Sequence, residues 1–546
     1  MNESPSPKSK GFRETSKSAF QKTPLSAGDW IDPDTPNLTP EELESLSIDT
    51  GLPIASLRGA GSFYADNAWK NSSNSVVQVC DGTSCRLGGG SSIEAILHRY
   101  GHECQRVYCL GFCDRSPVSM IPNEQLREQS PTSIRNLAPE AIITRRILAG
   151  PVHEIKKAIE AGVYTGLVNA LGFSPSHLIE EVEKSGERGR GGAGFPTGKK
   201  WRMAAESDSD QKYVIANGDE GDPGSFLDRV LMEQDPHTII EGMTLCGYAI
   251  GASEGIIYIR SEYPQAVEVM HEAIADARRE GYLGQDICGS GFNFDIRVFI
   301  GKGSYVCGEE TALIASLEGL RGEVRLRPPY PVQVGLHGKP TVVNNVETLS
   351  NIPFIAKKGG EAYAFYGTHA TSGTKAISLN HGFQNPGLVE VELGITFREV
   401  IEEIGGGGRD GEPLAAVLVG GPMGTILKPE DWDYPICFEV MDRHGIQLGH
   451  GGFVAIPEST DFHDLLIHLT EFMIRESCGK CVPCRLGSQA FLKAINENRE
   501  IAELEEMLDA IEAGSLCAFG QFVPGPIRTL LADFQDRIFG PKNQNN

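Results

Sequence analysis

The feature that most constrains this 546-residue sequence is a group of four cysteines near its C-terminal end. Cys478, Cys481 and Cys484 follow one another in ESCGKCVPC, and Cys517 comes after a stretch with helical periodicity. Three thiolates at this spacing can occupy three corners of an iron–sulfur cubane, which a remote fourth thiolate completes. Structural zinc is the alternative, but it usually uses two separated C-x2-C pairs. The spacing therefore favours a [4Fe–4S] cluster, held by a tight loop and a returning helical segment.

A second group of four cysteines lies nearer the N-terminus, as Cys80 with Cys85 and Cys109 with Cys113. A predicted helix over 91–101 separates the pairs, and each pair lies beside a short apolar run. Two loops at neighbouring strand ends would then present two thiolates each, which suits the two irons of a [2Fe–2S] cluster. Pairs of cysteines are also typical of zinc sites, so spacing alone leaves both ligands open.

The other five of the 13 cysteines lack such spacing, and we expect no ligand role for them. Cys246, Cys307 and Cys437 are predicted to be buried packing residues and Cys288 to be structural, while Cys104 is interpreted as a bystander. The first 35 residues have no apolar core of signal-peptide length, so they are interpreted as a disordered leader and the compartment as the reducing cytoplasm. There, clustered cysteines indicate metal or redox ligands and not disulfides.

Charge and hydropathy exclude two classes of partner. Lys and Arg number 49 against 73 Asp and Glu, which gives a net charge of −24. Nucleic-acid affinity is built from Lys and Arg contacts to phosphate, so we expect no nucleic-acid partner. No window approaches about 18 consecutive apolar residues, so neither a membrane span nor direct membrane contact is expected.

A glycine-rich loop over 185–201 reads SGERGRGGAGFPTGKKW. Three of its glycines satisfy G-x-G-x-x-G, namely Gly189, Gly191 and Gly194. The dinucleotide fingerprint requires a preceding strand, whereas 174–186 has helical periodicity, and no Walker A motif occurs. What remains is a loop with little side-chain bulk that carries Arg190, Lys199 and Lys200. Such a loop lets backbone N–H groups approach a phosphate, although a plain surface loop is the alternative.

Strands and helices alternate after the glycine loop. Strands are predicted at 213–217, 255–260 and 294–301, and helices at 237–251, 263–281 and 309–319. This alternation indicates a parallel α/β core, in which ligands bind beyond the carboxyl ends of the strands. Two predicted loops at that position hold polar residues, which are Asp219, Glu220 and Asp222, then Tyr305, Glu309 and Glu310. Adjacent amides follow at Asn344 and Asn345. Ribose and ring recognition, a Ca²⁺ or Mg²⁺ site and solvated turns all remain open for the acidic loops.

Together these stretches resemble one family. GRGGAGFPTGKKW, NGDEGDPGSF…DR, SYVCGEETALIASLEG…RPPYP and CGKCVPC occur in the order found in the NADH-binding flavoprotein subunit of respiratory complex I. Its relatives include the diaphorase subunits of NAD-reducing hydrogenases and of NAD-dependent formate dehydrogenases. The resemblance covers about 150–540. Residues before it, with GLPIASLRGAGSFYA and CLGFCDRSP, resemble the thioredoxin-like [2Fe–2S] subunit that partners this flavoprotein, which favours iron–sulfur for the N-terminal cysteines.

The resemblance implies a multidomain α/β fold. Its expected parts are a disordered leader at 1–35, a short helical segment with a thioredoxin-like [2Fe–2S] domain at 36–145, an FMN- and NAD(H)-binding domain at 150–370, a β-grasp domain at 371–455 and a helical [4Fe–4S] domain at 456–546. The nucleotide domain would be Rossmann-like without using the G-x-G-x-x-G fingerprint.

The resemblance also implies roles for individual residues. The glycine loop would hold FMN through Gly189, Arg190, Gly191 and Gly192, with Asn344 and Asn345 on the phosphate side and Lys200 reaching toward cofactor and nucleotide. The flavin ring would be flanked by Asn217, Asp219 and Glu220. The nucleotide side would be lined by Tyr305, Gly308, Glu309 and Glu310. NAD would contact Asp222, with Phe195 and Tyr330 stacked on its adenine. Cluster iron would be bound by Cys80, Cys85, Cys109, Cys113, Cys478, Cys481, Cys484 and Cys517.

The function implied is that of a diaphorase subunit. A hydride would pass between NAD(H) and FMN, and single electrons would pass through the two clusters. Glu220 is predicted to tune the flavin pocket. The leading partner is the large subunit of a formate dehydrogenase, because the fused N-terminal cluster domain resembles that system; hydrogenase and complex I subunits are the alternatives. From a different class, a non-catalytic scaffold held together by zinc is the competing hypothesis.

Overall fold

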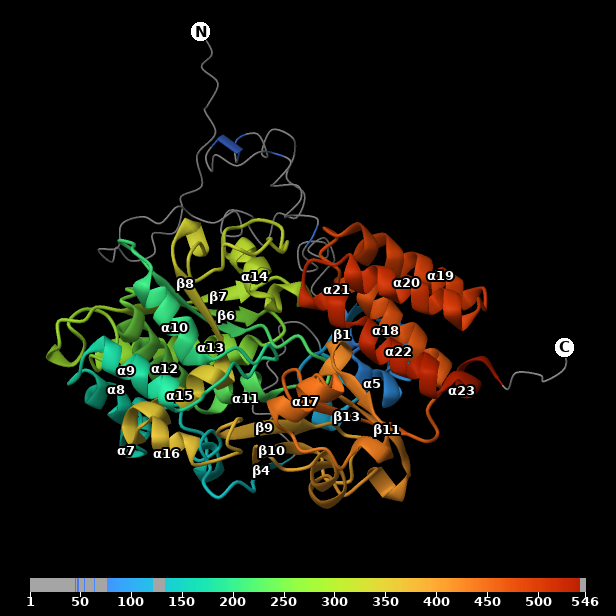
Figure 1. The fold of residues 1–546 in the computed structure, drawn as a ribbon, viewed down its shortest axis with the longest axis horizontal. Helices are drawn as coiled ribbons and strands as arrows, with labels where there is room; N and C mark the ends of the chain where they lie inside the picture. Colours follow the sequence, from blue (N-terminus) through green and yellow to red (C-terminus); the bar gives the residue numbers. More distant parts are fainter. Residues whose placement is uncertain are drawn as a thin grey trace, which may run out of the picture.

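The structure is a computed structural model that describes residues 76–120 and 133–540, with isolated positions at 45, 47, 48, 54 and 63. The predicted leader at 1–35 lies outside the described residues, as does most of the helical segment predicted after it. The part expected to bind FMN and NAD(H), at about 150–370, is called the nucleotide domain below. Figure 1 shows it on the left and the C-terminal helices on the right, with β1 and α5 between them. Among the described residues, no helix is long and apolar enough to cross a membrane.

The N-terminal cysteine group lies on a three-stranded sheet in the order β2-β1-β3. Its elements are β1 (Val77–Cys80), α5 (Thr83–Leu87), α6 (Gly90–Arg99), β2 (Cys104–Val107), η1 (Cys113–Arg115) and β3 (Ser119–Met120). Strands β1 and β2 are parallel, so both end at the same edge of the sheet. This confirms the expectation that two neighbouring loops carry the two cysteine pairs.

The nucleotide domain is built on a four-stranded parallel sheet in the order β7-β6-β5-β8. Its strands are β5 (Tyr213–Gly218), β6 (Glu254–Arg260), β7 (Asp295–Gly301) and β8 (Thr341–Asn345). Its helices are α7 (Ile155–Glu160), α8 (Thr165–Ala170), α9 (Pro175–Lys184), α10 (Thr197–Glu206), α11 (Leu227–Gln234), α12 (Pro236–Ile250), α13 (Pro264–Arg279), α14 (Glu310–Leu317), α15 (Val346–Lys358) and α16 (Gly360–Ala364), with short turns η2 (Ile147–Ala149), η3 (Ile287–Gly289), η4 (Tyr305–Gly308) and η5 (Leu336–Gly338). The predicted alternation is confirmed.

Apolar residues pack on both faces of the central strands β5 and β6, as expected for parallel strands that are buried on both sides. Alternate side chains of β5 point to opposite faces. Val214 and Ala216 pack into a core shared with α12 and α15, whereas Tyr213 and Ile215 pack with Leu313 of α14. The faces are therefore filled, and the polar loops after β5 and β7 meet at the carboxyl edge.

A six-stranded sheet has the order β12-β11-β13-β9-β10-β4, and five of its strands follow the nucleotide domain in the sequence. Its strands are β4 (Ile134–Asn136), β9 (Thr374–Leu379), β10 (Gly387–Glu392), β11 (Leu414–Val419), β12 (Thr425–Leu427) and β13 (Gly452–Pro457), accompanied by α17 (Phe438–His444), the π-helical η6 (Glu399–Ile404), and the turns η7 (Arg409–Gly411), η8 (Gly421–Met423) and η9 (Pro429–Asp431). The predicted boundary at 145 placed β4 with the N-terminal cluster domain. The structure instead pairs β4 in parallel with β10, a long-range pairing that local sequence cannot reveal.

The C-terminal segment is helical. It contains α18 (Phe462–Glu476), the π-helical turn η10 (Pro483–Gly487), α19 (Ser488–Asn496), α20 (Ile501–Ala513), α21 (Ala518–Phe522), α22 (Pro524–Asp533) and α23 (Gln535–Phe539). Asp461 caps the first of these helices by accepting a hydrogen bond from the backbone N–H of Asp464. The C-terminal cysteine group lies inside the apolar core to which these helices contribute.

Candidate functional site

The C-terminal cysteines converge as a metal site requires. Cys478, Cys481, Cys484 and Cys517 are each less than 9% exposed and belong to one apolar cluster. Gly479 turns the loop with a φ of +80°, which glycine adopts without strain. Burial raises the pKa of Cys517 to about 11, so in this surrounding thiolates need a bound cation to offset their charge. The donor set fits the predicted [4Fe–4S] cluster.

The N-terminal cysteines also converge, from the two loops at the edge of the small sheet. The Sγ atoms of Cys109 and Cys113 are 3.5 Å apart, and the thiol of Cys80 is in hydrogen-bond contact with those of Cys85 and Cys109. All four side chains are buried. Two pairs of buried sulfurs fit the predicted [2Fe–2S] cluster, which takes two thiolates on each iron.

The remaining cysteines divide differently from the prediction. Cys246, Cys307 and Cys437 are buried, as expected. Cys288 is exposed, so its predicted structural role is wrong. It lies in the short turn η3 with a φ of +51°. Neighbouring apolar residues gave no warning of this, because turn geometry decides the direction.

The glycine loop closes against the N-terminus of α15. The N–H of Gly189 donates to the carbonyl of Phe195 at 2.9 Å, which closes the loop on itself. A Cβ atom at Gly191 would lie 3.1 Å from the Cβ of Asn345, and Gly192 has a φ of +119°. Asn345 caps α15, its Oδ1 accepting from the N–H groups of Glu347 and Thr348. A backbone loop free of side chains beside a helix N-terminus is suited to a phosphate, so these residues fit the phosphate of FMN.

The basic residues of this loop do not all face outward. The Arg190 guanidinium is buried and donates to Glu187, to the Tyr363 hydroxyl at 2.8 Å and to the Ser372 carbonyl at 2.9 Å. Its charge is thus neutralised beneath the loop. Lys200 is different, because its Nζ donates to the carbonyl of Val343 at 3.0 Å, remains partly exposed and is available at the carboxyl edge.

Lys200 and the amides of β8 bring the glycine loop and the sheet edge together. The Lys200 ammonium lies 3.5 Å from Glu310 Oε2, so two residues that are both predicted to lie near the nucleotide meet. Asn344 Oδ1 accepts from the indole N–H of Trp201 at 2.9 Å, which holds its amide against α10. Glu309 caps α14 and pairs with Arg327.

Hydrogen bonds tie the loop after β5 to the loop after β7. Asn217 donates to the Gly308 carbonyl at 2.8 Å, and the hydroxyl of Tyr305 donates to Asp222 Oδ1. Burial raises the pKa of Asp219 well above its ordinary value and also raises that of Asp222. Asp219 and Glu220 are buried, and the half-buried Asp222 accepts from Tyr305, so the acidic loop after β5 is not a solvated turn.

Two aromatic residues predicted to stack on adenine are exposed. Phe195 is 41% exposed and Tyr330 is 46% exposed, which is high for large apolar side chains. Exposed aromatic rings suit stacking on a planar ligand. Their role in binding stays a prediction.

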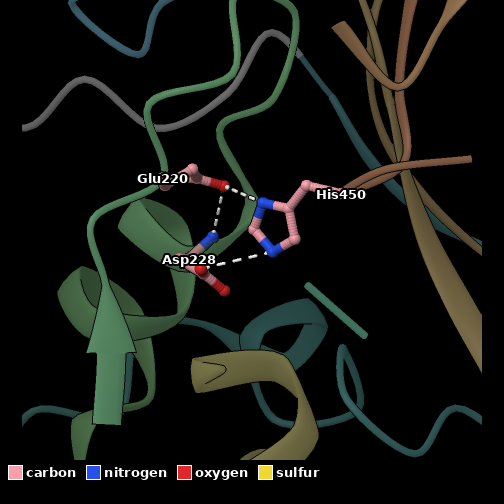
Figure 2. A group of neighbouring side chains, drawn as sticks. All are labelled: Glu220, Asp228 and His450. Atoms are coloured by element: carbon pink, nitrogen blue, oxygen red, sulfur yellow. Dashed lines mark hydrogen bonds and ion pairs between the residues drawn. The ribbon is translucent and has the colours of Figure 1, made fainter. Parts of the chain in front are cut away.

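Glu220 belongs to a buried triad with Asp228 and His450, shown in Figure 2. His450 precedes β13 and places its ring between the two carboxylates. Its Nδ1 is 3.3 Å from Glu220 Oε1, and its Nε2 is 3.2 Å from Asp228 Oδ2. Glu220 also accepts from the N–H groups of Asp228 and Arg229, which caps α11.

Electrostatics keep this triad charged. Although burial lowers the pKa of His450, the two carboxylates raise it well above its ordinary value. Burial raises the pKa of Asp228 to about 6. Burial also opposes ionisation of Glu220, but the hydrogen bond and charge of His450, together with the N–H groups of Arg229 and Asp228, outweigh it and lower the pKa of that carboxyl. An imidazolium between two carboxylates is the stable arrangement.

Sequence reasoning missed Asp228 and His450. Asp228 stood inside a quoted motif without a role, and His450 occurs in LGHGGFV, a segment with no metal or catalytic spacing. A lone histidine among glycines gave no signal. Its partner lies more than two hundred residues earlier in the chain, and only folding brings them together.

Hydrogen-bond donors of the chain thus surround the carboxylate of Glu220, and the residue as a whole is only 7% exposed. The hydroxyl of Tyr263 also approaches its Oε2 at 3.2 Å. A side chain so enclosed acts on a neighbouring ligand by fixing the loop at 219–225. Its predicted influence on the flavin pocket is therefore expected to be that of a positioning residue.

Comparison with known proteins gives three matches to family models. A Nuo51 FMN-binding domain matches residues 182–354, an NADH-ubiquinone oxidoreductase-F iron-sulfur binding region matches 464–539, and a thioredoxin-like [2Fe-2S] ferredoxin matches 34–141. These cover the glycine loop, both acidic loops and both cysteine groups. The FMN, [4Fe–4S] and [2Fe–2S] modules are present in the chain, in the places where the residues fit these groups.

Similar whole proteins include a NADP-reducing hydrogenase subunit HndC of Solidesulfovibrio fructosivorans, 44% identical over 68% of this chain and 77% of that protein. An F-type subunit of the NADH-quinone oxidoreductase of Rhizobium meliloti is 39% identical over 72% of this chain and 96% of its own length. A crystal structure of an NAD⁺-reducing [NiFe]-hydrogenase in the H₂-reduced state matches with a TM-score of 0.80 and 28% identity, covering 94% of this chain and 91% of the other.

Proposed function

Because the chain belongs to the family of F-type NADH-quinone oxidoreductase subunits and their hydrogenase relatives, we propose that it exchanges electrons between NADH and a partner subunit. The chain is an oxidoreductase subunit with an FMN-binding domain, a [4Fe–4S] region and a [2Fe–2S] domain. The observation that carries the proposal is the meeting of the glycine loop, the α15 N-terminus and both acidic loops at one sheet edge, with both cysteine groups in the same chain.

The chain's residues supply binding and orientation. When bound, FMN supplies the change between two-electron hydride transfer and one-electron transfer. Gly191, Gly192 and the α15 N-terminus would hold its phosphate. Asn217 and Asp219 would border its ring system, while Lys200 would offset negative charge from the nucleotide.

Purification of the chain without oxygen tests this proposal. We expect a brown-yellow protein that releases FMN on denaturation, contains iron in both cluster types and reduces an artificial dye with NADH. A colourless protein loaded with zinc would contradict the proposal and favour the scaffold hypothesis. The dye assay isolates the NADH–FMN step, because it needs no partner subunit.

The partner is proposed as the catalytic large subunit of a dehydrogenase. The fused N-terminal cluster domain favours a formate dehydrogenase. Similarity to a hydrogenase subunit and to a hydrogenase structure supports a hydrogenase as the second candidate. A complex I assembly is the third. Identification of the large subunit that co-purifies with the tagged chain distinguishes them, since formate, hydrogen and quinone activities belong to different subunits.

Replacing Glu220 with glutamine is expected to lower NADH turnover while FMN stays bound. Gln keeps the shape, but its NH₂ group cannot accept from the α11 N–H groups or from His450, so the side chain accepts only about half as many hydrogen bonds. Loss of a charge-assisted hydrogen bond costs roughly 1.5–3 kcal/mol, so the 219–225 loop should shift. Steady-state NADH–dye kinetics with flavin content as control provide the measurement; unchanged kcat would contradict a positioning role.

Replacing Tyr330 with alanine is expected to raise the KM for NADH by roughly three- to tenfold, because aromatic stacking contributes about 0.5–1.5 kcal/mol. Flavin and iron content should be unchanged, since the side chain is half exposed and packs on no cluster residue. Tyr330→Phe is the matched control and should keep most of the affinity. An unaltered KM in the alanine variant would remove Tyr330 from the binding site.

A further inference from the structure

The loop that carries Cys109 and Cys113 packs on the nucleotide domain. Residues 108–113, which we call the cluster loop, follow β2, and their two cysteines belong to the apolar core of the nucleotide domain, whereas Cys80 and Cys85 belong to a separate small core. Gly111 shows how close this packing is. A Cβ atom there would lie 2.6 Å from the ring of Tyr263, and its φ is +76°.

Two buried arginines of the nucleotide domain bind the cluster loop. Arg260, at the end of β6, donates from Nη2 to the Tyr108 carbonyl at 2.9 Å. Arg229, in α11, donates from Nε to the Gly111 carbonyl at 3.0 Å and lies 4.2 Å from the centre of the Phe112 ring. The two side chains are therefore hydrogen-bonded to carbonyls on either side of Cys109.

The orientation of each arginine directs positive charge toward the cluster loop. Arg229 pairs with Glu233 through Nη1, whereas its Nε faces the loop. Its Nη2 is buried without a hydrogen-bond partner among the described residues. Arg260 pairs with Glu262 and also donates to the backbone carbonyl of Glu220. Each of the two arginine residues is at most 5% exposed, so solvent screens their charges little.

A backbone N–H of the nucleotide domain reaches a ligand sulfur directly. Gly224 N–H donates to Cys113 Sγ at 3.3 Å. Gly224 lies in the loop after β5, whose conformation Glu220 fixes, and it has a φ of +122°. Hydrogen bonds to ligand sulfurs and nearby positive charge both stabilise the reduced, more negative form of an iron–sulfur cluster.

We infer that the nucleotide domain sets the reduction potential of the [2Fe–2S] cluster, through Arg229, Arg260 and the Gly224 N–H. The arginines are positioning and charge-tuning residues, and they raise the potential above the value that the thioredoxin-like domain alone would give. Because Arg260 also binds the carbonyl of Glu220, the same side chain contacts the loop beside the flavin and the loop of the cluster. This inference rests on the proposed function, which supplies the cluster.

Redox titration of the full-length chain by electron paramagnetic resonance tests the inference, with dithionite and mediators instead of NADH. We expect Arg229→Gln and Arg260→Gln each to shift the [2Fe–2S] midpoint to a more negative potential. The expected change is on the order of tenfold in the ratio of reduced to oxidised cluster at fixed potential, or about 59 mV for a one-electron couple. The [4Fe–4S] midpoint should not move.

Matched variants separate charge from packing. Arg229→Lys keeps the charge but loses the planar fork, so its shift should be smaller than that of Arg229→Gln. Arg278→Gln removes an equal charge from the partly exposed Arg278–Asp295 pair of the same domain and should have no effect. If Arg229→Gln does not fold, Arg229→Gln with Glu233→Gln leaves no unpaired carboxylate and should still shift the potential negatively.

Unchanged [2Fe–2S] potentials in the glutamine variants, or in the double variant, with full cluster content would overturn the inference. An equal shift in Arg278→Gln would also overturn it, because the effect would not be specific to the cluster loop. Absence of a [2Fe–2S] signal from the unmodified chain would overturn the cofactor assignment, and this inference with it. Because NADH is not used as the reductant, a failure of NADH oxidation alone leaves the result readable.

Discussion

Replacing Cys481 with alanine is expected to eliminate the [4Fe–4S] cluster and the transfer of electrons to any partner that depends on it. Cys481 is 8% exposed and lies inside the same core as the other three ligands. Alanine offers no lone pair, and a cubane bound by three thiolates exposes one iron to solvent. We expect a loss of about four iron atoms per chain.

The same substitution should destabilise the C-terminal helices. Metal binding to a site that does not exist in the unfolded chain contributes to folding free energy. Without the cluster, three buried thiols and an apolar hollow remain between η10 and α21. Iron analysis, electron paramagnetic resonance and the thermal transition of the full chain measure the three consequences together.

Cys288→Ala is the matched control for this experiment, since Cys288 is exposed and belongs to neither group. It should leave iron content and the thermal transition unchanged. NADH–dye reduction directly from the flavin should persist in Cys481→Ala, because the nucleotide domain has its own core. Full iron content in Cys481→Ala would show that the residue is not a ligand.

Replacing His450 with glutamine is expected to destabilise the protein by about 3–5 kcal/mol, the range for removing one partner from a buried ion network. Glutamine cannot carry the positive charge that lies between Glu220 and Asp228. Two buried carboxylates would then face each other with only the amide between them. For a domain of this size the thermal midpoint should fall by roughly 10 °C.

The loss of stability caused by His450→Gln should depend on pH in a defined direction. The folded protein raises the pKa of His450, so its stabilising contribution is fully present below the ordinary histidine pKa of about 6.5 and declines as the pH rises through the higher folded value. The difference in unfolding free energy between wild type and variant should therefore be larger at pH 5 than at pH 8.

Calorimetry at the two pH values gives this measurement. His369→Gln is the control, because His369 is an exposed histidine and its replacement should change little. A His450→Gln protein as stable as wild type at pH 5 would show that the triad is not an ion network. A larger loss at pH 8 than at pH 5 would contradict the protonation states assigned to it.

Much of the architecture followed from local sequence. The strands and helices predicted after the glycine loop occur within a few residues of their expected positions, because strand and helix periodicities are set by neighbouring residues. The two cysteine groups were recognisable because ligand spacing is a local property. The motif order indicated the family, and the family comparisons bear it out.

Three features could not be predicted. Strand β4 joins a sheet whose other strands lie more than two hundred residues later, and short strands pair according to tertiary contacts. The Arg190 charge was expected near a phosphate, but folding directs it to Glu187 and Tyr363. Cys288 was expected to be structural and is exposed. In each case the direction of a side chain or edge depends on what packs beside it.

The parts of this protein are encoded locally: two sets of metal ligands, a loop able to approach a phosphate and a parallel α/β core to hold it. These are short-range patterns, because ligand spacing, helical periodicity and glycine content act over a few residues. How the parts meet depends on long-range packing. His450 reached Glu220, and Arg229 and Arg260 reached the cluster loop, because buried charges are stable only where folding brings partners from distant segments into contact.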